Sequence, residues 1–223
     1  MMQKEEFLAQ EGDSWFQRNR TALLDDTKPD PVIDAIGHAR ISFREVLEIG
    51  CSNGWRLNRL RRETFASCAG IDPSRNSIED GRSRFPQLLL EVGTADQLPF
   101  SKCRFDLIIF GFCLYLCDRE DLFRIAQEAD RCLQDPGTII IYDFCPPFPY
   151  KNIYKYNSAL FTYKMDYSRL FSWNPAYTEI YRRIFAHASV SPVAAVDERV
   201  AVIILRKDSR EAYPQEPFEG SSD

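Results

Sequence analysis

Short apolar runs alternate with amphipathic segments along the first two thirds of the chain. Five apolar runs have the length and composition of buried strands: residues 44–50, 67–72, 87–93, 104–116 and 138–144. Three segments between them have apolar side chains at helical spacing: residues 55–63, 74–85 and 119–133. A DPG tripeptide at 135–137 predicts a turn before the fifth strand. Strands that alternate with helices predict an α/β fold, in which a parallel sheet is covered on both faces.

The regions on either side of this alternating pattern differ from it. Residues 12–38 have an amphipathic helical pattern, so we expect residues 1–37 to form an N-terminal helical cap. Residues 145–178 are rich in Pro, Tyr, Phe and Lys and show no clear period, which predicts an insert on the substrate side.

The C-terminal part of the chain returns to strand-like patterns and then loses them. Residues 178–187 and 197–207 alternate between apolar and polar positions, which predicts two more strands. We therefore expect one domain over residues 38–207. Residues 208–223 are polar and contain Pro and Gly, which predicts a disordered tail.

Composition narrows the classes of partner and compartment. The net charge is −5 over 223 residues, which argues against a nucleic-acid partner because phosphate binding needs a basic face. The N-terminus lacks the apolar region of a secretory signal, and no run approaches the roughly 18 apolar residues of a membrane span. Seven scattered cysteines without C-x-x-C spacing predict reduced thiols in a cytoplasmic protein. With two histidines in the chain, we expect no metal site.

The stretch LEIGCSNGW at 47–55 carries the main chemical signal, and it has three interpretations. Gly50, Ser52 and Gly54 fit the G-x-S-x-G pattern of a serine hydrolase, but that needs a downstream base, for which His187 is the one candidate. A nicotinamide-binding loop would need glycine where Ser52 and Trp55 stand. The third interpretation is a ligand that has an adenosine but no phosphate, such as S-adenosylmethionine.

Acidic residues near successive strand ends favour the third interpretation. Glu48 precedes the loop and suits the amino end of the ligand, directly or through water. Asp72 follows the loop by about 20 residues, which suits a pair of ribose hydroxyls. Asp96 can accept from the adenine amino group, with Gln97 and Leu98 on either side of the ring. The loop amides would bind the carboxylate of the ligand.

Five motifs occur in the order and spacing of a known family: VLEIGCSNG, GIDPS, GTADQLPF, FDLIIFGFCLYL and LQDPGTIIIYDF. Together they resemble the class I S-adenosylmethionine-dependent methyltransferases, with Ser52 where many members have glycine. The resemblance implies a Rossmann-like, doubly wound, seven-stranded sheet that is mostly parallel and has an antiparallel last strand at 199–206. It also implies cofactor contacts at Trp15, Asn19, Arg20, Glu48, Gly50, Cys51, Ser52, Gly54, Asp72, Pro73, Ser74, Asp96, Gln97, Leu98, Gly111 and Phe112.

Candidate groups for the chemistry and for the acceptor lie further along the chain. Asp143 ends the fifth strand and is a candidate base or acceptor anchor, although a capping role would also explain it. His187 is a second candidate base, with a structural role as its alternative. We expect the acceptor to contact Tyr115, Tyr150, Lys151, Tyr163 and Asp166.

The sequence therefore predicts an enzyme that moves a methyl group from S-adenosylmethionine to a small-molecule acceptor and releases S-adenosylhomocysteine. Residues 13–20 and 149–167 bear a looser likeness to a bacterial subgroup, which favours a sugar or a biosynthetic intermediate as acceptor. We expect a monomer or a homodimer. Two alternatives stay open, a cofactor-binding partner subunit without activity and a serine hydrolase.

Overall fold

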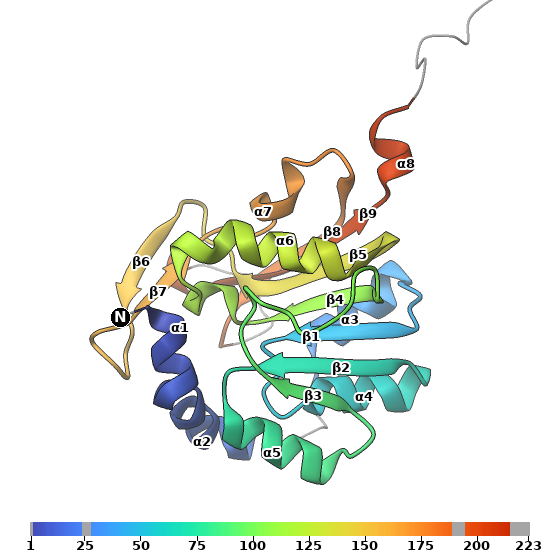
Figure 1. Ribbon diagram of the computed structural model, residues 1–223. Coiled ribbons are helices and arrows are strands. Elements are labelled where there is room, and N and C mark those ends of the chain that lie inside the picture. Colours follow the sequence, from blue (N-terminus) through green and yellow to red (C-terminus); the bar gives the residue numbers. More distant parts are fainter. Residues whose placement is uncertain (1, 24–27, 189–194, 215–223) are drawn as a thin grey trace, which may run out of the picture.

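A seven-stranded sheet forms the centre of the computed structural model, which describes residues 2–23, 28–188 and 195–214 (Figure 1). The order of the strands is β3-β2-β1-β4-β5-β9-β8. Their bounds are β1 Glu45–Ile49, β2 Ser67–Asp72, β3 Leu89–Val92, β4 Phe105–Gly111, β5 Leu133–Phe144, β8 Tyr177–Ala186 and β9 Arg199–Lys207. β1 to β5 pair in parallel, while β9 is antiparallel to both of its neighbours. The predicted sheet and its antiparallel last strand are confirmed.

The helices cover both faces of the sheet. Figure 1 shows α6 in front of the sheet and α3 and α4 behind it. The main helices are α3 Pro31–Ala39, α4 Trp55–Thr64, α5 Arg75–Arg84 and α6 Leu122–Cys132. Because helices cover both faces, central strands are apolar at successive positions; in β4 the side chains from Leu107 to Phe110 are all fully buried.

Local sequence fixes where the helices begin. Asp30 caps α3, since its Oδ1 accepts from the amides of Val32 and Ile33 over 2.9 and 3.0 Å, and Pro31 occupies the first turn. Ser74 caps α5 by accepting from the amide of Ser77 over 3.0 Å. Each cap thus fixes the residue at which its helix begins.

A continuous helical arm, residues 3–23, runs along the carboxyl ends of the strands. It consists of α1 Gln3–Glu6, the π-helical turn η1 Phe7–Glu11 and α2 Gly12–Leu23. Figure 1 places the arm between α5 and the hairpin formed by β6 Tyr150–Ile153 and β7 Phe161–Lys164. The predicted helical cap over residues 1–37 stays a prediction, and α3 runs across its boundary at residue 37.

The insert at 145–178 has more regular structure than its sequence pattern predicts. It contains the hairpin of β6 Tyr150–Ile153 and β7 Phe161–Lys164, followed by the short helix α7 Arg169–Ser172. The hairpin is two-stranded and half exposed, so it lacks the strict alternation that identifies a strand in a larger sheet.

Two smaller predictions differ from the structure. The DPG segment lies within β5, where the partner of β4 jumps from Leu133 to Thr138, so the expected turn is an irregularity of a longer strand. The tail begins with the short helix α8 Ser209–Ala212, because Asp208 caps it by accepting from the amide of Arg210. The rest of the predicted disordered tail, residues 215–223, lies outside the described residues.

Candidate active site

The loop between β1 and α4 is a tight turn at the carboxyl end of the sheet. Gly50 and Gly54 both have a φ of 76°, and Ser52 has a φ of 50°. A Cβ on Gly50 would lie 2.6 Å from the Cβ of Cys113, so a larger residue would push the loop away from the segment after β4. The amide of Gly50 donates to the carbonyl of Ile71 over 2.9 Å, which fixes the loop against β2.

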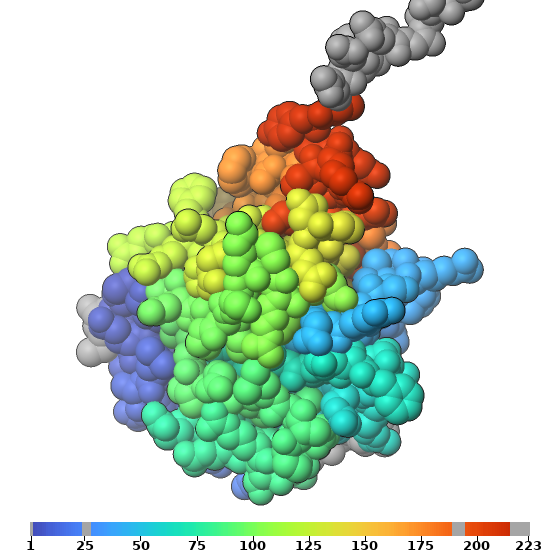
Figure 2. All heavy atoms as spheres, turned by 45° about the vertical axis from the view of Figure 1, so that its right-hand side comes forward, coloured from blue at the N-terminus to red at the C-terminus, as the bar shows by residue number. Residues whose placement is uncertain are grey.

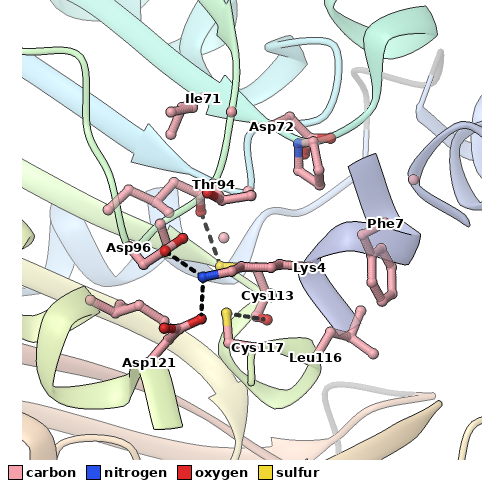
Figure 3. Close-up of a pocket in the computed structure, with 18 of the residues that line it drawn as sticks. Lys4, Phe7, Ile71, Asp72, Thr94, Asp96, Cys113, Leu116, Cys117 and Asp121 are labelled. Carbon is pink, nitrogen blue, oxygen red and sulfur yellow. Dashed lines mark hydrogen bonds and ion pairs between the residues drawn. The ribbon is translucent and has the colours of Figure 1, made fainter. Parts of the chain in front are cut away.

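A cleft opens beside this loop, at the carboxyl ends of β1 to β4 (Figure 3). It holds about 880 Å³ of space between atoms, with its open mouth included. The strand ends and their loops line one side, and the helical arm lines another through Lys4, Phe7, Gly12 and Trp15. The cleft is thus built by segments far apart in the sequence.

Asp72 occupies the end of β2 and lines the cleft. Its Oδ2 accepts from the amide of Ser52 over 2.8 Å, and its Oδ1 accepts from the amide of Ser74 over 2.9 Å. Burial of the carboxylate raises the pKa of Asp72 to about 6, against the lowering effect of these amides. A carboxylate has about four acceptor positions, so Asp72 can still accept from a ligand.

Asp96 lies across the cleft on the loop after β3, next to a cation. The Nζ of Lys4 lies 2.8 Å from Asp96 Oδ2 and 2.8 Å from Asp121 Oδ2. Burial opposes ionisation of Asp96, but the hydrogen bonds from Lys4 and Thr94 outweigh it and lower its pKa. Asp96 is therefore a carboxylate at neutral pH.

Glu48 belongs to a buried charge network beneath the loop. Arg56 donates through Nε to Asp30 Oδ2 over 2.8 Å and through Nη1 to Glu48 Oε1. Burial raises the pKa of Glu48 to about 7, against the opposing charge of Arg56. A Cβ on Gly111 would lie 2.5 Å from Glu48 Oε1, so the carboxyl group lies under that strand end. Glu48 does not line the cleft.

Three comparisons with known proteins bear on this cleft. Residues 46–137 match the family model for a methyltransferase domain. The matched segment carries the glycine loop, Asp72 and Asp96, and it folds as the sheet half that forms the cleft. Over residues 46–137 the chain is thus similar to methyltransferase domains. The resemblance to the S-adenosylmethionine-dependent family is thereby confirmed.

Solved structures show the same fold at low sequence identity. The 1,6-didemethyltoxoflavin-N1-methyltransferase of Burkholderia thailandensis, bound to 1,6-didemethyltoxoflavin and S-adenosylhomocysteine, is 16% identical, with a TM-score of 0.68 over 92% of this chain and 87% of that chain. An S-adenosylmethionine-dependent methyltransferase of Methanosarcina mazei is 16% identical, with a TM-score of 0.63 over 81% and 99%. A Haloferax volcanii protein solved in complex with a methyltransferase activator is 16% identical, with a TM-score of 0.64 over 92% and 97%. No curated protein sequence matches the chain significantly.

The methyltransferase domain and the helical arm bring half of the predicted cofactor residues to the cleft. Those that line it are Trp15, Gly50, Ser52, Asp72, Pro73, Asp96, Gly111 and Phe112. Four others support the cleft from behind, namely Glu48, Cys51, Gly54 and Ser74. Cys51 is buried, Gly54 precedes α4, and Ser74 donates to Asp13 as well as capping α5.

The remaining four predicted cofactor residues lie outside the cleft lining. Asn19 donates to the carbonyl of Trp15 over 2.8 Å, and Arg20 pairs with Asp80 over 3.0 Å. Leu98 is buried in the core, while Gln97 is exposed. None of the four lines the cleft in this structure, and their predicted cofactor contacts stay predictions.

Asp143 is buried inside the protein rather than in the cleft. Its Oδ1 accepts from the amide of Phe144 over 2.7 Å, and its Oδ2 accepts from the amide of Tyr115 over 3.3 Å, at the turn η2 Leu114–Leu116. Burial raises the pKa of Asp143 to about 7. The side chain is 2% exposed, so the geometry favours the capping role over that of a base.

His187 lies one aromatic layer behind the cleft. Its ring stacks on Phe112, with centroids 5.1 Å apart and an interplanar angle of 15°, and Phe112 lines the cleft. Phe144 and Tyr115 complete this aromatic cluster. Burial lowers the pKa of His187, so the ring is neutral at pH 7 and can accept a proton.

The arrangement lacks the base of a serine hydrolase. Both histidines are among the described residues, and neither bonds Ser52. His38 Nδ1 lies 2.7 Å from the carbonyl of Asp34, and His187 belongs to the aromatic cluster. The Ser52 hydroxyl has no hydrogen-bond partner in the described parts of the chain, so nothing activates it as a nucleophile.

The predicted acceptor residues do not line the cleft. Tyr115 lies closest, since its ring is 5.1 Å from that of Phe112. The other four contact their neighbours: Tyr150 donates to Asp197, Lys151 lies over Phe161, Tyr163 lies under Arg119, and Asp166 pairs with Arg182. In this structure these four side chains thus have partners in the hairpin itself or in segments packed against the insert.

Sequence reasoning missed the cleft residues from two segments. Lys4, Phe7 and Gly12 come from the helical arm, and residues 113–125 supply Cys113, Leu116, Cys117, Asp118, Asp121 and Ile125. The second segment follows β4, so the rule that ligands bind at carboxyl strand ends could have found it. The helical arm carries no sequence motif that predicts its place beside the cleft. Figure 2 shows the arm, in dark blue, lying against the green segment after β4.

Within the described residues, no helix is long and apolar enough to span a membrane. No three His, Cys, Asp or Glu side chains there come close enough to one another to hold a metal ion. All seven cysteines are unpaired, including the two that line the cleft, Cys113 and Cys117.

Proposed function

We propose that this chain is an S-adenosylmethionine-dependent methyltransferase that acts on a small-molecule acceptor. The observation that carries the proposal is the position of Asp72 and Asp96, which line one cleft beside the glycine loop of a methyltransferase domain. Asp72 would bind the ribose hydroxyls, and Asp96 would accept from the amino group of the base. The Burkholderia neighbour, which binds 1,6-didemethyltoxoflavin, supports an acceptor of small-molecule size.

The loop also fits the amino-acid end of this cofactor. Ser52 lines the cleft, and its buried Oγ has no partner among the described residues. A buried polar atom without a partner costs roughly 1–3 kcal/mol, and a ligand carboxylate would satisfy it. Glu48 has no direct part in this assignment, because it lies beneath Gly111.

Catalysis by these residues would rest on positioning and on exclusion of water. The cofactor, when bound, supplies an already activated methyl group on its sulfonium. The cleft and the helical arm would hold the acceptor in line with that group, and such positioning can supply roughly 7–11 kcal/mol. His187 is the base that we propose for an acceptor that must lose a proton, and this role requires an acceptor that extends past Phe112 to within hydrogen-bond reach of the imidazole.

Calorimetry followed by a turnover assay tests the proposal. We expect the purified protein to bind S-adenosylmethionine and S-adenosylhomocysteine, and to transfer labelled methyl groups into at least one fraction of cellular metabolites. Failure to bind either nucleoside would overturn the proposal. Binding without turnover on any fraction would instead favour the partner-subunit alternative.

A further inference from the structure

Lys4 reaches into the cleft from the first turn of the helical arm. Its ammonium lies between the carboxylates of Asp96 and Asp121, with both Nζ to Oδ2 distances at 2.8 Å (Figure 3). The three residues come from the arm, from the loop after β3 and from the start of α6. The two carboxylates are 10% and 13% exposed, and the lysine side chain is 25% exposed.

The backbone around Lys4 fixes the direction of this side chain. The amides of Gln3 and Lys4 donate to the two carboxylate oxygens of Asp118, each over 2.9 Å. The side-chain amide of Gln3 donates to the carbonyl of Leu116 over 2.8 Å. The start of the arm is therefore fastened to the segment after β4, and Lys4 is held over the cleft.

The pair of Lys4 and Asp96 presents a donor beside an acceptor. An ammonium has three N–H donors, and two of them are directed at Asp96 and Asp121. The third has no partner among the described residues. Asp96 also keeps acceptor capacity, because a carboxylate has about four acceptor positions.

We propose that Lys4 and Asp96 together recognise the base of the bound nucleoside. Asp96 accepts from an exocyclic amino group, and Lys4 donates to a ring nitrogen beside that group. Adenine has this donor next to an acceptor on its edge. This inference rests on the proposed function, and it adds a specificity-determining residue outside residues 46–137.

The contact to the ring nitrogen can be tested by removing that nitrogen from the ligand. The probes are S-adenosylhomocysteine and its 1-deaza and 7-deaza analogues, in which CH replaces one ring nitrogen. We expect the unaltered protein to bind one of the two analogues about tenfold more weakly than the parent, as for loss of a hydrogen bond to a charged group. Lys4→Met should bind the parent about tenfold more weakly and no longer discriminate against that analogue.

The control variants separate recognition from a purely structural role. Lys4→Arg keeps the charge and should retain most of the affinity. Lys102→Met removes an exposed lysine on the loop before β4 and should leave all three affinities unchanged. If Lys4 only holds the arm in place, Lys4→Met lowers all three affinities equally and the discrimination persists, which overturns the inference.

Two further outcomes are equally clear. Tighter binding of the parent nucleoside by Lys4→Met would mean that Lys4 competes with the base for Asp96, which also overturns the inference. Absence of binding by the unaltered protein would overturn the proposed function itself. The ratio of parent to analogue affinities therefore tests Lys4 separately from the function of the cleft.

Discussion

The two halves of the sheet differ in whether their polar side chains face a cleft. At the carboxyl ends of β1 to β4, Asp72 and Asp96 line a cleft, and Ser52 Oγ has no partner among the described residues. Around β5 and the hairpin, the polar groups lie outside the cleft and have partners within the protein. Asp143 accepts from backbone amides, and Lys164 lies 2.8 Å from Asp197.

On the proposed function, this difference separates the half of the sheet that would bind the cofactor from the half that would shape an acceptor site. Polar atoms that face a cleft without full satisfaction are expected where a ligand completes the hydrogen bonds. The family model covers residues 46–137 and stops before most of the second half. The part of the chain that matches a methyltransferase domain therefore lies mainly in the first half, which forms the cleft.

The largest expected effect is in the second half, at His187. If His187 is the base for an acceptor that loses a proton, His187→Gln should lower kcat by about 100-fold or more. Its affinity for S-adenosylhomocysteine should stay within about twofold, because His187 does not line the cleft. Steady-state kinetics on the active metabolite fraction and calorimetry measure the two quantities.

The pH profile of the unaltered protein sharpens the test of His187. Burial lowers the pKa of His187, so its neutral form persists below the usual range near 6.5. The rate should therefore rise with pH through that lowered pKa and be level at pH 7. An unchanged kcat in His187→Gln would assign the ring to packing against Phe112 alone.

The next effect lies in the first half, at Asp72. Asp72→Ala removes the acceptors for the ribose and also releases the amide of Ser52. We expect affinity for S-adenosylhomocysteine to fall by about 100-fold, as for loss of two hydrogen bonds to a charged group. Glu79→Ala, on the exposed side of α5, is the matched control and should not change it. Equal affinities in both variants would contradict the assignment of the cleft.

The sequence predicts most of the cleft residues in the first half of the sheet, because the backbone there requires particular residue types. Gly50 and Gly54 need positive φ, and Asp72 is aligned by the amide of Ser52 from the same loop. These relations are local or depend on strand ends, which parallel sheets bring together. Fewer of the residues predicted on the helical arm line the cleft: Trp15 does, whereas Arg20 pairs with Asp80.

Residues outside those constraints could not be assigned from the sequence. Lys4 reaches Asp96 only through the folding of the arm over the sheet, which no local pattern records. Asp143 stands at a strand end, where the sequence predicts a base or an acceptor anchor. Its carboxylate instead accepts a hydrogen bond from the backbone amide of Tyr115. Rules about position at a strand end do not reveal whether the side chain points out or back into the protein.

A smaller effect, on stability, tests the capping role of Asp143. Its pKa rises to about 7 in the folded protein, so the folded state holds its proton longer than the unfolded state does. The free energy of unfolding should therefore fall as the pH rises from about 4 to 7. Asp143→Asn should show a fall that is smaller by at least about 1.4 kcal/mol, the equivalent of one pKa unit. Denaturant titrations at pH 4.5 and 7.5 measure the difference.

Asp72 and Glu48 have raised pKa values as well, so they contribute a fall of the same sign in the same range. The comparison between the unaltered protein and Asp143→Asn removes these contributions. Parallel pH profiles would mean that Asp143 is ionised at no cost in the folded protein.

The smallest effect is expected at Lys151 on the hairpin. Lys151 is exposed, and its Nζ lies 4.4 Å from the ring centroid of Phe161. Lys164, on the paired strand, is 6% exposed and is bound to Asp197. Lys151→Ala should change the free energy of unfolding by less than about 0.5 kcal/mol, whereas Lys164→Ala should lower it more because it leaves a buried gap.

The KM for the acceptor then shows whether the hairpin contacts the acceptor or only packs against the rest of the protein. If its polar groups are satisfied by one another, Lys151→Ala should leave the KM for the acceptor within about twofold. A KM raised tenfold or more would show that the exposed lysine contacts the acceptor in the working complex. In that case the hairpin must move toward the cleft on binding, and the contrast between the two halves would hold only for the protein without its ligands.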